Sequence, residues 1–244
     1  MSSLLPDLSD RLVADELMDD PSIDDGRLDG ALANLRWTNR LLGGYTANNA
    51  LLDPLLAERS RLRVLDLGTG GADYLAHLVR RGHRRECRVE VVGVDSNPAT
   101  VAYANDWLDN AMSGLFRPRV CIDEADARSL PYPDDAFDVT MATLFLHHFY
   151  DEDAVQVLGE MKRVSQGGAF VNDLHRHPIA YLGIQGLCRL LPVSSMYRHD
   201  APLSVQRGFV RSELRALARQ AAWKPPRIQW HWAFRYTMST VPAV

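Results

Sequence analysis

Short apolar runs alternate with amphipathic segments through the middle of the chain. Runs that are apolar and rich in β-branched residues predict strands, at 63–67, 88–94, 118–122, 137–143 and 168–172. Amphipathic segments between them predict helices, at 72–81, 98–110 and 151–164. Strands that alternate with helices of about ten or more residues form β-α-β units, which build a parallel sheet with right-handed connections. The pattern therefore predicts an α/β fold.

The two ends of the chain have other patterns. Residues 4–58 carry leucines at roughly helical intervals, and Asp53-Pro54 is expected to start one more helix with Asp53 as its N-cap. The tail predicts a further helix and an antiparallel hairpin, at 211–222, 228–232 and 234–240. We therefore expect three parts. Residues 1–58 form a helical cap, residues 59–177 and 209–244 form the main domain, and residues 178–208 form a lid or insertion after the fifth strand.

Composition and charge narrow the class of protein. The 244 residues are 46% hydrophobic and 24% charged, and the net charge of −4 argues against a broad basic surface for nucleic acid. Cys87, Cys121 and Cys188 are far apart, which is typical of reduced thiols rather than disulfides or a zinc site. No signal peptide is evident, and no apolar run approaches the roughly 20 residues that span a bilayer. We expect a cytoplasmic protein that binds no nucleic acid and does not insert into membranes.

The strongest local signal is the turn Gly68-Thr69-Gly70-Gly71, which follows the first predicted strand. Glycines allow a positive φ and let a ligand approach the backbone, and open parallel sheets bind ligands beyond the carboxyl ends of their strands. A tight turn without a ligand is the alternative. The turn thus indicates a ligand site at this edge of the sheet.

Carboxylates follow the next two strands. Asp95 ends the second strand, where a carboxylate accepts two hydrogen bonds from a ribose diol; capping the next helix is its alternative role. Asp126 follows the third strand, where it can meet the exocyclic amine of an adenine; a solvated loop aspartate is the alternative. These positions favour a ligand that contains a ribose and an adenine.

Four segments, in this order, resemble the class I S-adenosylmethionine-dependent methyltransferases: VLDLGTGGADYLAHL, VVGVDSNP, EADARSLPYPDDAFDVTMATLFLHHF and KRVSQGGAFVND. The resemblance covers about residues 61–173 and is to small-molecule O-methyltransferases, similar to the ubiquinone/menaquinone-biosynthesis group. It implies a Rossmann-like seven-stranded sheet of order 3-2-1-4-5-7-6, with strand seven antiparallel and helices on both faces. One departure is Ala72, which stands where the family usually has its third glycine.

The resemblance implies S-adenosylmethionine as cofactor. It also implies which positions of this chain contact each part of that cofactor. Asp66 and the glycine turn would line the methionine part, the next two strand ends the ribose and the adenine, and the end of the fourth strand the reaction centre. Arg40 is expected to meet the cofactor's carboxylate, with a surface arginine as the alternative. The expected cofactor-binding residues are Asp66, Gly68, Thr69, Gly70, Asp95, Ser96, Asp126, Ala127, Thr143 and Arg40. Asp66 and Asp73 would repel a pyrophosphate, whereas a cationic sulfonium tolerates both.

Methyl transfer to a hydroxyl needs in-line alignment and removal of a proton. The resemblance implies that His147, which follows the fourth strand, is the general base and that Asp173, at the end of the fifth strand, orients it. A structural role for His147, or His148 as the base, are the alternatives. The residues expected to bind the acceptor are His148, His175, Trp37 and Tyr181.

A metal is not expected. Asp173, His175 and His177 would share one face of an extended strand and could join His147 as ligands, but Pro178 ends any such strand. In-line methyl transfer requires no metal.

The sequence therefore predicts transfer of a methyl group from S-adenosylmethionine to a small-molecule acceptor, by preference a phenolic or other hydroxyl oxygen of an aromatic secondary metabolite. Three alternatives remain: C-methylation of a quinone-type precursor, a nicotinamide-dependent Rossmann oxidoreductase, and a non-catalytic cofactor-binding protein. A homodimer through the apolar residues of the 178–208 segment is also left open.

Overall fold

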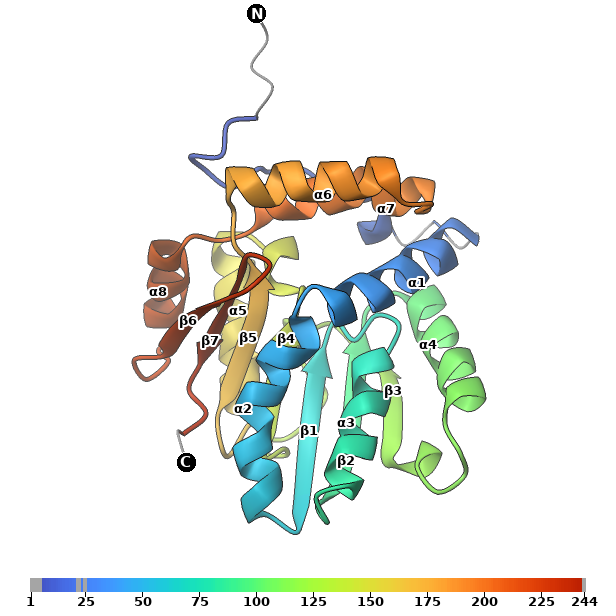
Figure 1. Ribbon diagram of the computed structural model, residues 1–244. Helices are drawn as coiled ribbons and strands as arrows, with labels where there is room; N and C mark the ends of the chain where they lie inside the picture. Colours follow the sequence, from blue (N-terminus) through green and yellow to red (C-terminus); the bar gives the residue numbers. More distant parts are fainter. Residues whose placement is uncertain (1–5, 21–22, 24–25, 243–244) are drawn as a thin grey trace, which may run out of the picture.

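The computed structural model describes residues 6–20, 23 and 26–242, and its centre is a seven-stranded sheet (Figure 1). The strands are β1 (Arg61–Leu67), β2 (Arg88–Asp95), β3 (Val120–Glu124), β4 (Val139–Thr143), β5 (Ala169–Leu174), β6 (Arg227–His231) and β7 (Arg235–Ser239). Their order is β3-β2-β1-β4-β5-β7-β6, and only β7 runs antiparallel to its neighbours β5 and β6. The predicted fold is therefore confirmed.

Helices cover both faces of this sheet. They are α1 (Gly26–Leu41), α2 (Gly44–Glu58), α3 (Asp73–His83), α4 (Pro98–Ala111), α5 (Asp151–Arg163), α6 (Pro178–Leu190), α7 (Ser195–Arg207) and α8 (Arg211–Gln220). Short 3₁₀ turns are η1 (Leu17–Asp19), η2 (Arg117–Arg119) and η3 (Leu146–His148). One apolar core joins α2, α3 and α4 to the sheet, and a second joins α5 and α8 to its other face. Burial on both faces explains why the central strands are nearly continuous apolar runs.

The strand register brings the predicted site residues to one edge. In β1, Leu67 pairs with Val94 of β2 and with Ala142 of β4, while Thr143 of β4 pairs with Asn172 of β5. The parallel strands therefore end together, so the glycine turn, Asp95, Thr143 and Asp173 lie along the same rim. Figure 1 shows α6 and α7 lying across this rim, with α1 beside them.

The segment between β5 and α8 leaves the sheet and returns beside its starting point. Phe209 donates its backbone N–H to Leu174 at 2.8 Å, and Arg176 donates to Phe209 at 3.1 Å. Between these residues, α6 and α7 pack on α1 around a third apolar core, formed by Leu28, Ala31, Leu32, Cys188, Val193, Met196 and Tyr197. Helices α1, α6 and α7 thus form one layer over the rim, whereas α2 packs on a face of the sheet. The division of the chain into a cap, a main domain and a lid stays a prediction. Within the described ranges, no helix combines the length and the apolarity needed to cross a membrane.

Two predictions for the N-terminal part are wrong. Asp53 and Pro54 do not start a helix: Pro54 lies inside α2, and the Asp53 carboxylate binds the Arg81 guanidinium through both oxygens, at 2.6 and 2.5 Å. Residues 6–20, which we call the strap, form no α-helix: beyond the short turn η1, their backbone bonds groups that are distant in the chain. Arg176 Nε donates to the Leu8 carbonyl at 3.0 Å, and Leu12 donates to the Gln206 carbonyl at 3.2 Å. The sequence Asp24-Asp25-Gly26 indicates a break between helices, and residues 24 and 25 lie outside the described residues.

Candidate active site

A cavity of about 460 Å³ opens at the carboxyl ends of β1, β2 and β4, under the strap, α1, α6 and α7. A smaller cavity of about 90 Å³ adjoins it, and the two share five wall residues: Gly68, Asp95, Ser96, Phe145 and Phe149. The larger cavity is lined by the glycine turn and by acidic and aromatic side chains; the smaller one is lined by the loop after β3. The rim thus offers one continuous site with a broad part and a narrow part.

The glycine turn forms the floor of the broad part. Gly68 has φ +65°, and a Cβ there would lie 2.0 Å from the Phe145 ring. Gly70 has φ +51°, and Ala72 adopts the same left-handed region with φ +55°. Gly68 is therefore required both for backbone conformation and for space, whereas Ala72 accepts its left-handed conformation at a strain cost of about 1 kcal/mol. The departure from the family's third glycine is thus tolerated locally.

Asp95 stands where both parts of the site meet. Its carboxylate accepts backbone N–H groups from Gly70 at 3.2 Å and from Asn97 at 3.1 Å. Burial raises the pKa of Asp95 from its ordinary value, and the backbone donors oppose that rise. Helix α4 is capped by Asn97, whose side chain accepts from Ala99, so Asp95 is not needed as the side-chain cap. Its position leaves it facing the cavity, as the ribose prediction requires.

Asp126 and Ala127 line the narrow part of the site. The Asp126 carboxylate pairs with the Arg128 guanidinium at 2.8 Å and accepts the Arg128 backbone N–H at 2.8 Å. These bonds to Arg128 lower the pKa of Asp126, so the carboxylate is ionised. It is available as an acceptor for an amine at the mouth of this narrow part.

Asp66 is buried in β1 behind the glycine turn and does not line the cavity. Its Oδ1 accepts no hydrogen bond from the described residues, and burial raises the pKa of this carboxyl to about 8. Asp73 lines the cavity and accepts a hydrogen bond from the Tyr45 hydroxyl. Of the described residues that line the broad part, Glu16, Asp19, Asp73 and Asp95 are acidic and none is lysine or arginine. This acidic lining suits a cationic ligand and disfavours a pyrophosphate.

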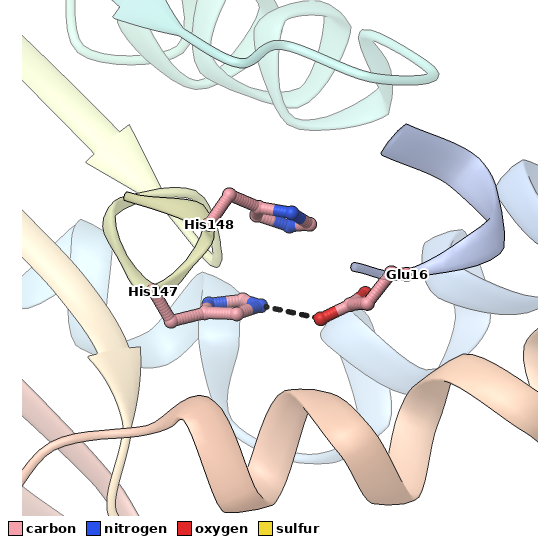
Figure 2. Close-up of side chains that lie close together, drawn as sticks. All are labelled: Glu16, His147 and His148. Carbon is pink, nitrogen blue, oxygen red and sulfur yellow. Dashed lines mark ion pairs between the residues drawn. The ribbon is translucent and has the colours of Figure 1, made fainter. Parts of the chain in front are cut away.

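His147 lies at the acceptor end of the cavity, between two carboxylates. Its Nδ1 is 2.7 Å from Asp173 Oδ1, its backbone N–H donates to Asp173 Oδ2 at 3.1 Å, and its Nε2 is 3.5 Å from Glu16 Oε1. Figure 2 shows the His147 ring and the Glu16 side chain pointing toward each other, with His148 beside them. His147 and Glu16 are each 2% exposed, and Asp173 is fully buried. The structure therefore brings together the predicted pair and adds a third member from the strap.

The charge of His147 follows from these neighbours. Burial alone would lower its pKa, but Asp173 and Glu16 outweigh burial and raise the pKa of His147 to about 9. In the absence of an acceptor, His147 is consequently an imidazolium at neutral pH, with Nδ1 directed at Asp173 and Nε2 at Glu16. A general base must be neutral, so this charge state bears directly on the predicted role.

His148 and Asp19 form a second pair on the cavity wall. His148 Nδ1 lies 2.6 Å from Asp19 Oδ1, and Arg207 Nη1 donates to Asp19 Oδ2 at 2.8 Å. Glu16, His147 and His148 lie close enough together to hold a metal ion, with ligand atoms within 4.8 Å of one another (Figure 2). However, Arg207 Nη1 is only 3.6 Å from Glu16 Oε1. This buried guanidinium supplies positive charge at the same carboxylate and would repel a dication.

Thr143 lies on the cavity wall at the end of β4, as predicted. Its hydroxyl accepts a hydrogen bond from Asn48 Nδ2 at 2.9 Å, and Asn172 Nδ2 in turn donates to Asn48 Oδ1 at 2.8 Å. This buried amide chain joins α2 to β4 and β5, and it fixes the rim beneath the cavity.

Four predicted site residues lie away from both cavities. Arg40 is exposed near the end of α1, and its neighbour Asn39 lines the cavity instead. Trp37 packs against the core beneath α6 and α7. Tyr181 accepts a hydrogen bond from Gln185 on α6, and His175 accepts one from Trp230 Nε1 at 3.2 Å among aromatic rings of β7 and its turn. The helical rotation of α1 and α6 and the strand alternation of β5 aim these side chains elsewhere.

Sequence reasoning missed Glu16 and Asp19. Both lie in an acidic stretch that resembles a solvated surface run, and no motif marks them. Their position depends on contacts with distant residues: Leu17 and Met18 donate their backbone N–H groups to Asp200 of α7 at 2.9 and 3.1 Å. The sequence carries no signal for these contacts, because the burial of the Asp200 carboxylate, which requires partners, is visible only in the structure.

Comparisons with known proteins find methyltransferases. A family model described as a methyltransferase domain matches residues 64–168. Demethylmenaquinone methyltransferase of Thermus thermophilus is 34% identical over 140 residues, which are 57% of this chain and 54% of that protein. The 27-O-demethylrifamycin SV methyltransferase of Amycolatopsis mediterranei is 32% identical over 136 residues, which are 56% of this chain and 42% of that protein. Other relatives are named as C- and N-methyltransferases.

The alignments thus span about half of the length of these relatives. A solved structure of a SAM-dependent methyltransferase from Aquifex aeolicus has the same fold, with a TM-score of 0.56 and 17% sequence identity. The alignment covers 90% of this chain and 97% of that chain.

Proposed function

Because the chain belongs to the class I S-adenosylmethionine-dependent methyltransferases, we propose that it transfers a methyl group from S-adenosylmethionine to a hydroxyl oxygen of a small aromatic molecule. The observation that carries this proposal is the continuous acidic site at the rim, which ends at the buried His147–Asp173 pair. The acidic walls suit a sulfonium, and the pair lies where an acceptor's proton must be handled.

The chain's own residues would hold the cofactor by its separate parts. Asp95 would accept from the ribose hydroxyls, and Asp126 would accept from the adenine amine in the narrow part. The glycine turn and Asp73 would face the methionine part, whereas Asp66, buried behind the turn with its pKa raised to about 8, would be mostly uncharged at neutral pH. When bound, the cofactor supplies an electrophilic methyl group. The protein must then align the acceptor and keep water out.

The acceptor class follows from the walls of the broad part. Phe145, Phe149, Leu35 and Ile184 provide apolar contacts, while His147 provides a polar end. An aromatic hydroxyl compound would satisfy both. Two roles for His147 fit this placement: general base with Asp173 as support, or charged hydrogen-bond donor to the hydroxyl oxygen. They differ in the charge of the ring.

C-methylation of a quinone-type precursor is a second candidate, since one relative is named a demethylmenaquinone methyltransferase. A quinol presents hydroxyls to the same polar end, but the new bond then forms to a ring carbon. The product distinguishes the two candidates, because an O-methyl ether and a C-methyl ring have different carbon NMR shifts.

The test is turnover of S-adenosylmethionine with a panel of phenols, catechols and naphthoquinols. We expect release of S-adenosylhomocysteine with at least one panel member, together with an O-methylated product. A C-methylated product would move the assignment to the second candidate. Saturable binding of S-adenosylmethionine without turnover of any member would support a non-catalytic binding protein instead.

A further inference from the structure

Two buried polar atoms at the acceptor end lack a close partner. Glu16 Oε1 and His147 Nε2 face each other at 3.5 Å, beyond ordinary hydrogen-bond length, and neither has another hydrogen bond from the described residues. Both side chains line the cavity. One oxygen can lie about 2.8 Å from each of two atoms at this separation. The two atoms can therefore both bind one hydroxyl oxygen that lies beside the line joining them.

We propose that Glu16 and His147 together bind the acceptor's hydroxyl, and that the Glu16 carboxylate takes its proton. The hydroxyl oxygen would accept a hydrogen bond from His147 Nε2–H and donate its own proton to Glu16 Oε1. This inference rests on the proposed function and deepens it, because it assigns the proton to the strap rather than to the histidine.

The charges around His147 favour this division of roles. Asp173 of β5 binds His147 Nδ1. From the strap, Glu16 adds negative charge near His147 Nε2, and Asp19 adds negative charge at the neighbouring His148. The cations nearby are Arg207 of α7 and Arg11 of the strap, whose guanidinium groups donate to the His147 carbonyl at 3.2 and 2.9 Å. The His148 ring packs against the His147 ring at a tilt of 33°, with centroids 4.3 Å apart, and its Nδ1 is held by Asp19. The carboxylates outweigh these cations at the ring, so His147 keeps its proton while Glu16 stays ionised.

The reaction step balances with these groups. The hydroxyl oxygen forms a bond to the methyl carbon as the carbon–sulfur bond breaks and its electron pair stays on sulfur. The hydroxyl proton passes to Glu16, while the imidazolium stabilises the negative charge that develops on oxygen. Glu16 later releases the proton to solvent, and Asp173 remains ionised throughout.

The strap is built to present Glu16 at this point. Arg11 Nη2 donates to the carbonyls of His147 and Phe149, at 2.9 and 3.0 Å, and its guanidinium packs on the Phe209 ring. On the other side of Glu16, Leu17 and Met18 are fixed by Asp200. These contacts tie the strap to η3 and to α7, so Glu16 is positioned by residues on both sides.

Glu16→Gln separates the two roles by the sign of its effect. If Glu16 takes the proton, turnover of the best panel phenol at pH 7 should fall by about 10²–10⁴, and Glu16→Asp should recover part of it. If His147 is the base, losing the neighbouring carboxylate makes the ring easier to deprotonate, and Glu16→Gln should be as fast or faster. Asp15→Asn, an exposed change in the same strap, is the matched control and should retain the wild-type rate.

Nitrogen NMR of the His147 ring supplies a measurement that needs no turnover. The ring should titrate near pH 9 in the wild type, lower in Glu16→Gln, and near pH 9 again in Asp15→Asn. A wild-type ring that titrates near its ordinary value, or one that Glu16→Gln leaves unchanged, would overturn the proposal. If no phenol turns over, the proposed function fails, while this titration still decides whether Glu16 acts on His147.

Discussion

The two ends of the site are built differently. At the cofactor end, the key groups follow consecutive strands, and Asp95 acts alone, held by two backbone N–H groups. At the acceptor end, Glu16, His147, Asp173 and Arg207 come from the strap, η3, β5 and α7, and their charges are interlocked. A change at the cofactor end should therefore act locally on one ligand contact. A change at the acceptor end should alter the chemistry and the stability of the fold together.

Of these changes, His147→Ala should lower the activity most, and its effect should be limited to the acceptor end of the site. We expect kcat for the best panel phenol to fall by about 10²–10⁴, because either role of the ring at the hydroxyl is lost. The affinity for S-adenosylmethionine should be unchanged by calorimetry. His83→Ala, an exposed histidine at the end of α3, is the control. An equal loss of cofactor affinity would mean that the two ends are not separable.

Asp173→Asn should destabilise the fold as well as slow the reaction. It leaves the buried His147 imidazolium without its main partner, and breaking such a pair costs about 3–5 kcal/mol. Denaturant unfolding at pH 7 measures this loss. The difference should shrink as the pH rises from about 6.5, the ordinary pKa of histidine, through about 9, where the ring in the folded wild type loses its charge. A stability equal to that of the wild type at pH 7 would contradict the interlocked charges.

Asp95→Ala should weaken cofactor binding without a comparable loss of stability. A hydrogen bond to a charged group contributes about 1.5–3 kcal/mol, so the Kd for S-adenosylmethionine should rise roughly 10-fold to 100-fold or more. Asp106→Ala, an exposed aspartate on α4, should leave the Kd as it is. If Asp95→Ala also leaves the Kd unchanged, the ribose does not bind at this strand end.

Removal of metal should have the smallest effect. Arg207 already supplies positive charge at Glu16, and the Nδ1 atoms of both histidines are directed at carboxylates. Turnover after treatment with EDTA should therefore match that of the untreated protein. Loss of activity that a divalent cation restores would instead make Glu16, His147 and His148 a metal centre.

The same contrast explains what the sequence could predict. The strands and the positions of Asp95 and Asp126 follow from segments that are continuous in the chain, so local pattern was sufficient for them. The order of the sheet and the His147–Asp173 pair came from the resemblance to the family, because local pattern does not say which strands are neighbours. The prediction that Arg40 and Trp37 line the site failed because each residue of a helix points to one side only. Which side of α1 faces the cavity is set by its packing against α7. Glu16 lies 131 positions before His147, and only tertiary contacts bring it into the site.

The most direct test of the central claim is calorimetric titration of the wild-type protein with S-adenosylmethionine and, separately, with NADH. The account predicts saturable one-to-one binding of S-adenosylmethionine, because the acidic rim is built for a cation, and no binding of NADH. Binding of the dinucleotide in place of S-adenosylmethionine would contradict it.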